Sequence, residues 1–188
     1  MRLFVGIPIA PATTHALQWL TARLRASEDG LRWTPPESWH ITLQFLGETS
    51  NDRFACLQEA LHSVKARPLT IEFESVVCFE QVGVVAVSVM LTRDLSALQR
   101  SVTQATARCG VIAEARPYAS HLTLARVRRG VRLRPHGALQ QAMRGDIRLP
   151  GYAAHEFLLY ESHLGTGGAR YEVRARFPLE ESADPARE

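Results

Sequence analysis

The sequence has little of several features that mark common protein classes. It holds only three cysteines, Cys56, Cys78 and Cys109, and no C-x-x-C pair. Neither a zinc cage nor a disulfide framework is therefore expected, and a reducing cytoplasm fits this cysteine usage. No apolar run approaches the roughly 20 residues that a membrane-spanning helix needs. There is also no G-x-G-x-x-G after the first expected strand and no Walker loop, which argues against dinucleotide-binding and P-loop folds.

A secretory signal is also poorly supported. The opening segment MRLFVGIPIAPA has a basic residue before an apolar run and an A-x-A near its end, as a short signal peptide would. Pro8 and Pro11 interrupt that run, however. We therefore interpret this segment as a buried first strand.

Lysine is nearly absent, because Lys65 stands alone against 21 arginines. The formal net charge is +3 and the isoelectric point is about 9.0. A mildly basic chain of this kind is compatible with an anionic partner but does not require one. A genome rich in G and C explains the shortage of lysine, yet the result is a surface of planar guanidinium groups suited to bidentate phosphate contacts.

The periodicity of the sequence predicts an α+β fold. The chain has 188 residues, 46% of them hydrophobic, which is enough to bury a core as one domain or as two tightly joined lobes. Strands are expected at 2–9, 39–46, 69–77, 83–91, 118–127, 153–163 and 170–178, and helices at 11–25, 51–66, 94–110 and 136–144. This mixed order favours α+β over a doubly wound parallel sheet. We expect one domain over residues 1–180 and a frayed polar tail over 181–188.

One tetrapeptide pattern occurs twice. HITL begins at His40 and HLTL begins at His121, 81 positions later, each after a loop and within an apolar strand. A single His-x-Thr in a strand is more often structural, but two copies in matching contexts indicate a shared site. Because side chains alternate along a strand, His40 and Thr42 share one face, as do His121 and Thr123. The apolar residues between them then point into hydrophobic layers.

Two histidines that face each other across a groove suit a displacement at phosphorus. Imidazoles with ordinary pKa values of about 6.5 can supply one base and one acid close to neutral pH. An in-line displacement puts the nucleophile and the leaving oxygen on opposite sides of phosphorus, so the base and the acid must also be opposed. The hydroxyls of Thr42 and Thr123 can donate to the non-bridging oxygens. Neither motif contains Asp, Glu or Cys, so the histidines form a poor metal site, and no metal or cofactor is expected.

Four blocks of the sequence together resemble a known family. They are RLFVGIPI at the start, LRWTPPESWHITLQFLGE around the first motif, RPYASHLTLARVR around the second, and LGTGGARYEVRARFPL near the end. With the paired H-x-T-x motif, these blocks resemble the two-histidine (2H) phosphoesterase superfamily. The resemblance is closest to its bacterial and archaeal RNA 2′,3′-cyclic phosphodiesterases, also called 2′-5′ RNA ligases.

The resemblance implies a fold and an activity. The fold is bilobed and duplicated, with two antiparallel sheets flanking a central cleft, helices outside, and one motif in each pseudo-symmetric half. The activity is metal-independent hydrolysis of 2′,3′-cyclic phosphate ends of RNA or nucleotides to 2′-phosphates, without a cofactor. We also expect a monomer that does not bind membranes. Matching positions make His40 the proton donor and His121 the proton acceptor, with Thr42 and Thr123 beside them. The symmetry of the motifs does not by itself orient the acid and the base.

Three further residues are candidates for substrate binding. Phe45 and Arg126 follow their histidines by five positions and could hold a nucleobase between a ring and a guanidinium plane. Five is an odd step, so base contact requires a strand end or a bulge. Otherwise Phe45 packs in the core and Arg126 is a surface charge. Tyr171, in the last block, either lines the cleft or, as we favour, packs in the core of a hairpin.

Several functions remain open on the sequence alone. The leading hypothesis is hydrolysis of 2′,3′-cyclic phosphates in RNA processing, and the same chemistry on another ester would cleave or join 2′-5′ linkages. An RNA-binding module without catalysis is a third possibility, but pure binding needs no paired acid and base. The arginines that follow the second motif form either a solvated loop or a track for the RNA backbone; they are Arg126, Arg128, Arg129, Arg132 and Arg134.

Overall fold

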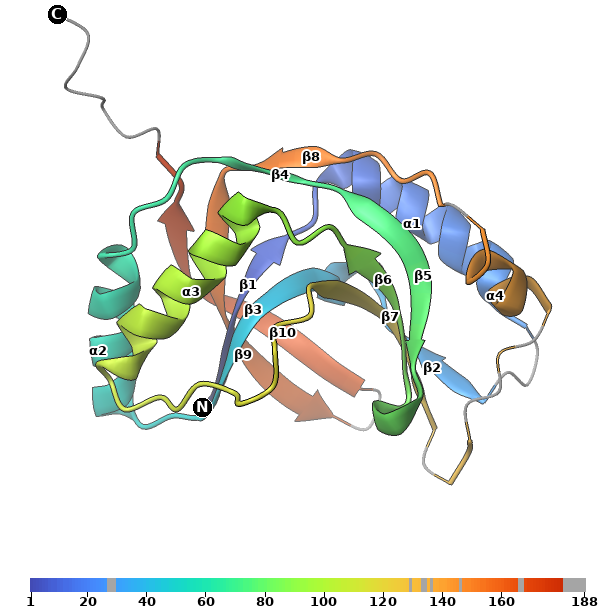
Figure 1. Cartoon of the computed structure of the whole chain (residues 1–188). Helices are drawn as coiled ribbons and strands as arrows, with labels where there is room; N and C mark the ends of the chain where they lie inside the picture. Colours follow the sequence, from blue (N-terminus) through green and yellow to red (C-terminus); the bar gives the residue numbers. More distant parts are fainter. Residues whose placement is uncertain are drawn as a thin grey trace, which may run out of the picture.

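The computed structural model alternates strands and helices largely as the sequence predicts (Figure 1). It describes residues 1–26, 30–128, 130–132, 135, 137–145, 147–165 and 168–180. The strands are β1 (Arg2–Pro8), β2 (Leu31–Trp33), β3 (His40–Glu48), β4 (Leu69–Ile71), β5 (Phe73–Phe79), β6 (Val84–Val89), β7 (His121–Val127), β8 (Tyr152–Ala154), β9 (Glu156–Gly165) and β10 (Gly168–Pro178). The α-helices are α1 (Pro11–Leu24), α2 (Asn51–His62), α3 (Arg93–Ala107) and α4 (Gly137–Ala142). The tail expected at 181–188 lies outside the described residues.

Most of the strands belong to one large antiparallel sheet. Its order is β10-β9-β1-β3-β7-β6-β5, with β2 pairing beside β7, and β4 and β8 form a separate two-stranded sheet. The α+β class is thus confirmed. The arrangement differs from the expected two sheets flanking a cleft, because a backbone bridge between Ile41 and Leu122 joins β3 directly to β7. The two H-x-T-x motifs meet at this bridge, in the middle of the sheet.

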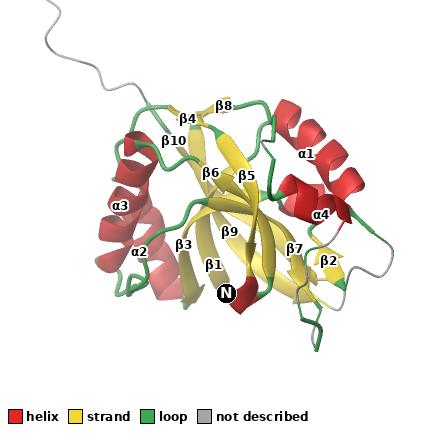
Figure 2. Ribbon diagram, turned by 45° about the vertical axis from the view of Figure 1, so that its right-hand side comes forward, coloured by secondary structure: helices red, strands yellow, loops and turns green. Residues whose placement is uncertain are grey.

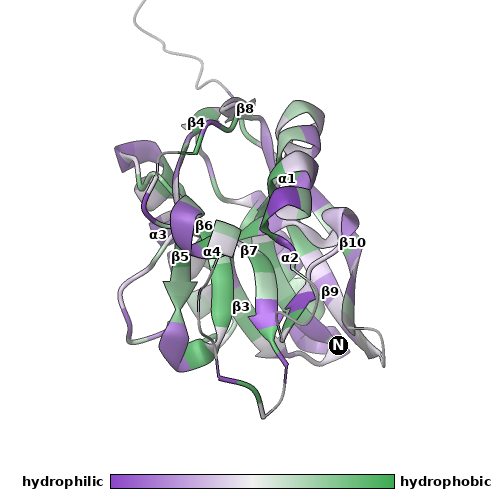
Figure 3. Ribbon diagram, turned by 90° about the vertical axis from the view of Figure 1, so that its right-hand side faces the viewer, coloured by the Kyte–Doolittle hydropathy of each residue, from purple (hydrophilic) through white to green (hydrophobic). Residues whose placement is uncertain are grey.

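Two hydrophobic cores lie beneath the sheet. The first packs α2 and α3 against β1, β3 and β9, and the second packs α1 and α4 against β2, β5, β6 and β7. Figure 2 shows the two helix pairs on opposite sides of the molecule, and Figure 3 shows apolar residues concentrated in the central strands. Ile41 and Leu43 belong to the first core and Leu122 and Leu124 to the second, as strand alternation predicts.

Helices α1 and α3 each pack against the strand of the motif that does not follow them directly in the chain. Helix α1 precedes the first motif in the chain, yet it packs in the second core with β7. Helix α3 precedes the second motif, yet it packs in the first core with β3. The two motifs are therefore held by segments from both parts of the chain, which ties their positions together.

Local signals account for the helix starts. The Oγ of Ser50 accepts a hydrogen bond from the backbone N–H of Arg53, so Ser50 is the N-cap of α2. Thr92 caps α3 in the same way through the N–H of Leu95. The sequence analysis does not anticipate β2, because three residues are too few to show a period. It expects single strands at 69–77 and 153–163, where the structure has β4 followed by β5 and β8 followed by β9. No helix in the described part of the chain is long and apolar enough to cross a membrane.

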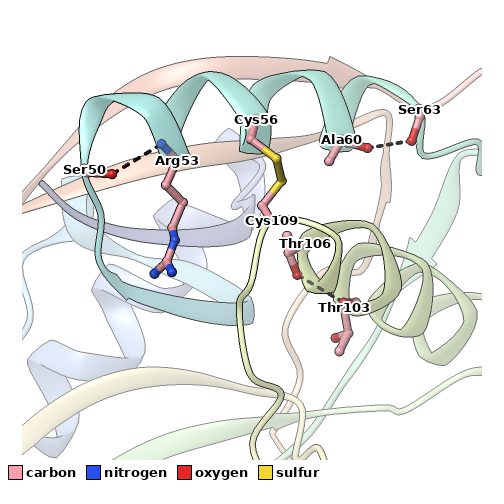
Figure 4. The surroundings of a disulfide bond; sticks show 8 residues. All are labelled: Ser50, Arg53, Cys56, Ala60, Ser63, Thr103, Thr106 and Cys109. Atoms are coloured by element: carbon pink, nitrogen blue, oxygen red, sulfur yellow. Dashed lines mark hydrogen bonds between the residues drawn. A yellow bond between two sulfur atoms is a disulfide. The ribbon is translucent and has the colours of Figure 1, made fainter.

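A disulfide joins Cys56 and Cys109, so the expectation of no disulfide is wrong (Figure 4). Cys56 lies within α2 and Cys109 follows the end of α3, with their Cα atoms 5.9 Å apart. The two residues are 53 positions apart in the chain, and only the packing of α2 against α3 brings them together. Cys78 is a free cysteine, and burial raises the pKa of its thiol.

Candidate active site

The two motifs lie on neighbouring antiparallel strands, with Ile41 directly opposite Leu122. Continuing this register sets His40 across from Thr123 and Thr42 across from His121. Paired residues point to the same side of a sheet, and Ile41 and Leu122 point into the cores. The other four side chains therefore share the opposite side, which we call the histidine face. Each of the four is partly exposed, in keeping with this placement.

The backbone holds both imidazoles in the same way. The Nδ1 atom of His40 lies 2.8 Å from the carbonyl oxygen of Ser38, and the Nδ1 atom of His121 lies 2.8 Å from the carbonyl oxygen of Ala119. A carbonyl oxygen can only accept a hydrogen bond, so Nδ1 carries the proton in each ring. Nε2 is then the atom of each histidine that can take up or give a proton.

Aromatic rings surround His40. Its ring centroid lies 4.6 Å from that of Phe4, 5.0 Å from that of Tyr171 in an edge-on contact, and 5.8 Å from that of Tyr160. Burial lowers the pKa of His40 to about 4, and the positive charges of His121 and Arg126 act in the same direction. His40 is therefore neutral in the free protein near pH 7.

The surroundings of His121 come from the other end of the sheet. Its ring meets Phe79, at the end of β5, edge-on at a centroid distance of 5.2 Å. Ser88 of β6 lies directly opposite His121, and its Oγ accepts a hydrogen bond from the backbone N–H of Ser75. The two histidines thus occupy different environments although their backbone contacts are the same.

A β-bulge at the last residue of each motif brings the residue five positions after the histidine onto the histidine face. On β3, Thr42 pairs with Gly6 and Gln44 pairs with Val5, which leaves Leu43 as the extra residue. Phe45 then pairs with Phe4, and their ring centroids are 6.1 Å apart. The bulge that base contact by Phe45 requires is therefore present.

The same irregularity occurs on β7. Thr123 pairs with Ala86 and Ala125 pairs with Val85, so Leu124 is the extra residue and Arg126 returns to the side of Thr123. Phe45 is 53% exposed, and Arg126 is exposed as well. The structure thus brings both residues to the histidine face, where neither is packed in a core.

Tyr171 lies next to His40 and also packs in a small cluster. Phe4, Leu158 and Tyr160 form a third hydrophobic cluster, against which Tyr171 packs. Tyr171 meets the ring of Phe4 edge-on at a centroid distance of 5.0 Å. Tyr171 therefore packs in this hairpin cluster, as favoured, with its ring against His40, and its contact with a substrate stays a prediction.

Sequence reasoning missed several residues of the site. The hydroxyl of Tyr118 donates a 2.9 Å hydrogen bond to the carbonyl oxygen of Thr42, and burial raises the pKa of Tyr118 to about 12. Phe4 and Tyr160 were assigned only to strands, although they flank His40. Both lie in runs of apolar residues, so no change of polarity along the sequence separates the histidine face from the core face of β1 or β9. The sequence also does not show which strands neighbour β3.

Two further observations complete the surroundings of the site. Of the basic residues after the second motif, Arg129 and Arg134 lie outside the described residues. Within the described ranges, no three His, Cys, Asp or Glu side chains gather closely enough to share a metal ion.

Several known proteins are similar to this chain in sequence. Residues 7–87, which include the first motif, match the family model described as LigT like phosphoesterase. An RNA 2′,3′-cyclic phosphodiesterase of Archaeoglobus fulgidus is 32% identical over 132 residues, which cover 69% of this chain and 74% of that protein. The protein of the same name from Bacillus subtilis is 26% identical over 181 residues, covering 94% of this chain and 95% of the relative.

A solved structure shares the fold over almost the whole chain. The crystal structure of E. coli LigT complexed with 3′-AMP superposes with a TM-score of 0.78 at 26% identity, covering 96% of this chain and 98% of LigT. The family assignment rests on the archaeal relative, which is matched over about three quarters of its length. Together with the paired motifs on one face of the sheet, it shows that this chain belongs to the LigT-like family of 2H phosphoesterases.

Proposed function

We propose that this chain is a metal-independent RNA 2′,3′-cyclic phosphodiesterase that opens the cyclic phosphate at an RNA or nucleotide end to a 2′-phosphate. The observation that best supports the proposal is the register of β3 against β7, which sets two imidazoles and two threonine hydroxyls on one face. The relatives from A. fulgidus and B. subtilis bear the name of this activity, and the E. coli relative was solved with a nucleotide, 3′-AMP.

In the proposed reaction the histidines act as one base and one acid. Nε2 of His121 takes a proton from water as the water oxygen attacks phosphorus, and Nε2 of His40 gives its proton to the leaving 3′-oxygen. The bond from phosphorus to the 3′-oxygen breaks as the new P–O bond forms, which leaves a 2′-phosphate and a 3′-hydroxyl. The hydroxyls of Thr42 and Thr123 donate to the non-bridging oxygens, where negative charge resides. Proton exchange with solvent then restores both histidines.

The environment of His40 adds a condition to this assignment. With a pKa of about 4 in the free protein, His40 is neutral near pH 7, whereas a general acid must carry a proton. The phosphate of a bound substrate is an anion beside the imidazole, and a negative charge within about 4–6 Å favours the charged ring. We therefore propose that His40 takes up its proton together with the substrate.

Three residues are proposed to bind the rest of the substrate. Phe45 is an exposed ring on the histidine face, which suits stacking on a nucleobase. Arg126 supplies a cation on the same face, and its charge reaches His40. Tyr171 packs edge-on against His40 and is proposed to border the terminal nucleoside.

The broader features of the family are also proposed for this chain. Two cores, each covered by its own helix pair, support a bilobed, duplicated arrangement within a single domain over residues 1–180. We further propose a monomer in the cytoplasm that acts in RNA processing without binding a membrane. The Cys56–Cys109 disulfide makes the oxidation state in cells a direct test of that compartment.

A panel of substrates with identification of the product isomer tests the function. Wild-type protein is incubated with 2′,3′-cyclic nucleotides, with RNA ending in a cyclic phosphate, and with 2′-5′-linked oligonucleotides, each with and without excess EDTA. We expect cyclic ends to be converted to the 2′-phosphate alone, as read by phosphorus NMR, at a rate that EDTA does not change.

Each other result has a defined meaning. A 3′-phosphate as the main product overturns the roles of the two histidines. Loss of turnover in EDTA, restored by a divalent ion, overturns the metal-free mechanism. Turnover of 2′-5′ linkages in preference to cyclic ends favours the ligase or 2′-5′ phosphodiesterase alternative. Binding of RNA without turnover of any substrate favours a binding module.

A further inference from the structure

Arg32 and Arg126 lie opposite each other on neighbouring strands. Strands β2 and β3 both pair with β7, β3 near the start of β7 and β2 near its end. In the pairing of β2 with β7, Arg32 is the partner of Arg126. Leu31 is buried in the second core, and Trp33 packs against that core. Because side chains alternate, Arg32 between them points to the opposite side, which is the histidine face.

The pair lies beside the proposed catalytic residues. Thr123 and Arg126 pair with Ala86 and Val84, which are two residues apart on β6, so their backbone positions are separated by about 6.6 Å. The charge of Arg126 also contributes to the lowered pKa of His40, which places the guanidinium group within electrostatic reach of that imidazole. Arg32, across from Arg126, extends the positive charge away from the histidines.

Neither Arg32 nor Arg126 has an ion-pair partner in the described part of the chain. Like charges directly opposite each other destabilise a sheet. Both side chains are exposed, and none of the ion pairs formed by the described residues includes Arg32 or Arg126. Some other exposed arginines of the sheet do have carboxylate partners, such as Arg176 with Glu156 at 2.7 Å. An external anion would therefore relieve the repulsion between Arg32 and Arg126.

We propose that Arg32 and Arg126 form a second phosphate site, which binds the phosphate on the 5′ side of the terminal nucleoside while the cyclic phosphate lies between the histidines. The inference rests on the proposed function and narrows its substrate class. Two guanidinium forks match the oxygens of one phosphate diester or monoester. The preferred substrates would then be oligonucleotide ends, or 5′-phosphorylated cyclic nucleotides, rather than cyclic nucleosides that carry a single phosphate.

Three adenosine substrates separate phosphate recognition from base recognition. They are adenosine 2′,3′-cyclic phosphate, the same compound with a 5′-phosphate, and the dinucleotide ApA with a 2′,3′-cyclic phosphate end. We expect kcat/KM for the second and third to exceed that for the first by about tenfold, the size of one charge-assisted hydrogen bond. A gain for the dinucleotide alone would mean that the additional nucleoside is recognised and not the phosphate, and would overturn the proposal.

The variant Arg32→Gln tests the residue itself. We expect Arg32→Gln to reduce the ratio of kcat/KM for the 5′-phosphorylated substrate to kcat/KM for adenosine 2′,3′-cyclic phosphate by about tenfold. With the dinucleotide, the slope of log kcat/KM against log salt should fall in magnitude by roughly 0.7, the value for one phosphate contact on a single strand. Arg23→Gln is the matched control, because Arg23 is an exposed arginine on α1, which packs on the other side of the sheet.

The outcomes distinguish this inference from the function beneath it. If wild-type protein hydrolyses none of the three substrates, the proposed function fails. If it hydrolyses all three equally, or if Arg32→Gln and Arg23→Gln behave alike, the second phosphate site is wrong and the phosphodiesterase activity stands.

Discussion

The hydroxyl of Tyr118, three residues before the second motif, donates a hydrogen bond to the carbonyl oxygen of Thr42 in the first motif. This bond crosses from the loop that leads into β7 to the strand β3. It therefore adds a second connection to the backbone bridge between Ile41 and Leu122. Since the proposed mechanism requires the two histidines to lie on opposite sides of one phosphorus atom, this hydrogen bond is expected to affect their alignment.

We expect Tyr118→Phe to lower kcat more than it raises KM. The variant keeps the buried ring but leaves the Thr42 carbonyl without its donor, which costs about 1–3 kcal/mol of stability. Tyr152→Phe is the control, because the hydroxyl of Tyr152 donates to the carbonyl of Pro8 at 2.8 Å and does not join the two motifs. Both variants should lose stability in urea, and only Tyr118→Phe should lose turnover. Equal kcat values for the two variants would show that Tyr118 has no positioning role.

The lowered pKa of His40 predicts a loss of stability in mild acid. In the unfolded chain the imidazole binds its proton as the pH falls below about 6.5, whereas the folded protein resists protonation until about pH 4. The unfolded state therefore gains protons first, and stability falls as the pH drops from about 6.5 to about 4. The loss assignable to His40 is on the order of 3 kcal/mol.

Urea unfolding of wild type and His40→Gln across this range measures the effect. The variant lacks the titrating group, so the difference in unfolding free energy between the two proteins should change with pH by about that amount. In parallel, NMR of the imidazole should show His40 neutral at pH 6 in the free protein and a raised pKa when 2′-AMP, a product of the proposed reaction, is bound. Titration of free His40 near 6.5 would contradict the burial argument and remove the need for proton uptake with substrate.

The position of the motifs was largely predictable from the sequence. Alternation of His40 and Thr42 with Ile41 and Leu43 identifies both the polar face and the core face of β3 without any structure. The same argument holds for β7. What alternation could not supply was the partner strand, because pairing of β3 with β7 depends on contacts between segments 81 positions apart.

Other parts of the site were beyond sequence reasoning for separate physical reasons. Arg32 is in a three-residue strand, too short to show a period, so its place opposite Arg126 is visible only in the register. The bulges at Leu43 and Leu124 change the face of the sheet to which Phe45 and Arg126 point. Neither bulge is marked by a glycine or proline at the bulged position. The sequence shows that base contact requires a bulge, but only the pairing between the strands shows where the bulge lies.

The four polar residues of the motifs should contribute unequally to turnover. His40→Ala and His121→Ala should each abolish activity, because each removes the only group proposed to give or accept a proton. Thr42→Ala and Thr123→Ala should cost less, on the order of 2–4 kcal/mol of transition-state stabilisation at most, as for the loss of one oxyanion donor. His163→Ala is the control, because His163 pairs with Glu172 on the β9–β10 hairpin.

Single-turnover rates with a cyclic nucleotide, together with circular dichroism to confirm folding, measure these effects. Retention of more than a few per cent of the wild-type rate by either folded histidine variant would rule out a mechanism that needs both imidazoles. Threonine variants as inactive as the histidine variants would mean that the hydroxyls do more than stabilise charge.

The disulfide should stabilise the fold without being required for catalysis. Cys56 and Cys109 join α2 to the end of α3, and both helices pack on the first core, on the opposite side of the sheet from the histidine face. Closing a loop between residues 53 positions apart restricts the unfolded chain and stabilises the fold by about 4 kcal/mol in the chain-entropy model.

We therefore expect dithiothreitol to lower the urea midpoint of wild type to that of the double variant C56S/C109S, and to leave the double variant unchanged. Cys78→Ser, which removes the free cysteine, should respond to dithiothreitol as wild type does. The turnover of all these proteins should be similar under conditions where they are folded. Three alkylated cysteines in the untreated protein, counted by mass spectrometry after unfolding without reductant, would show instead that the bond does not form and that the original expectation from the cysteine spacing was right.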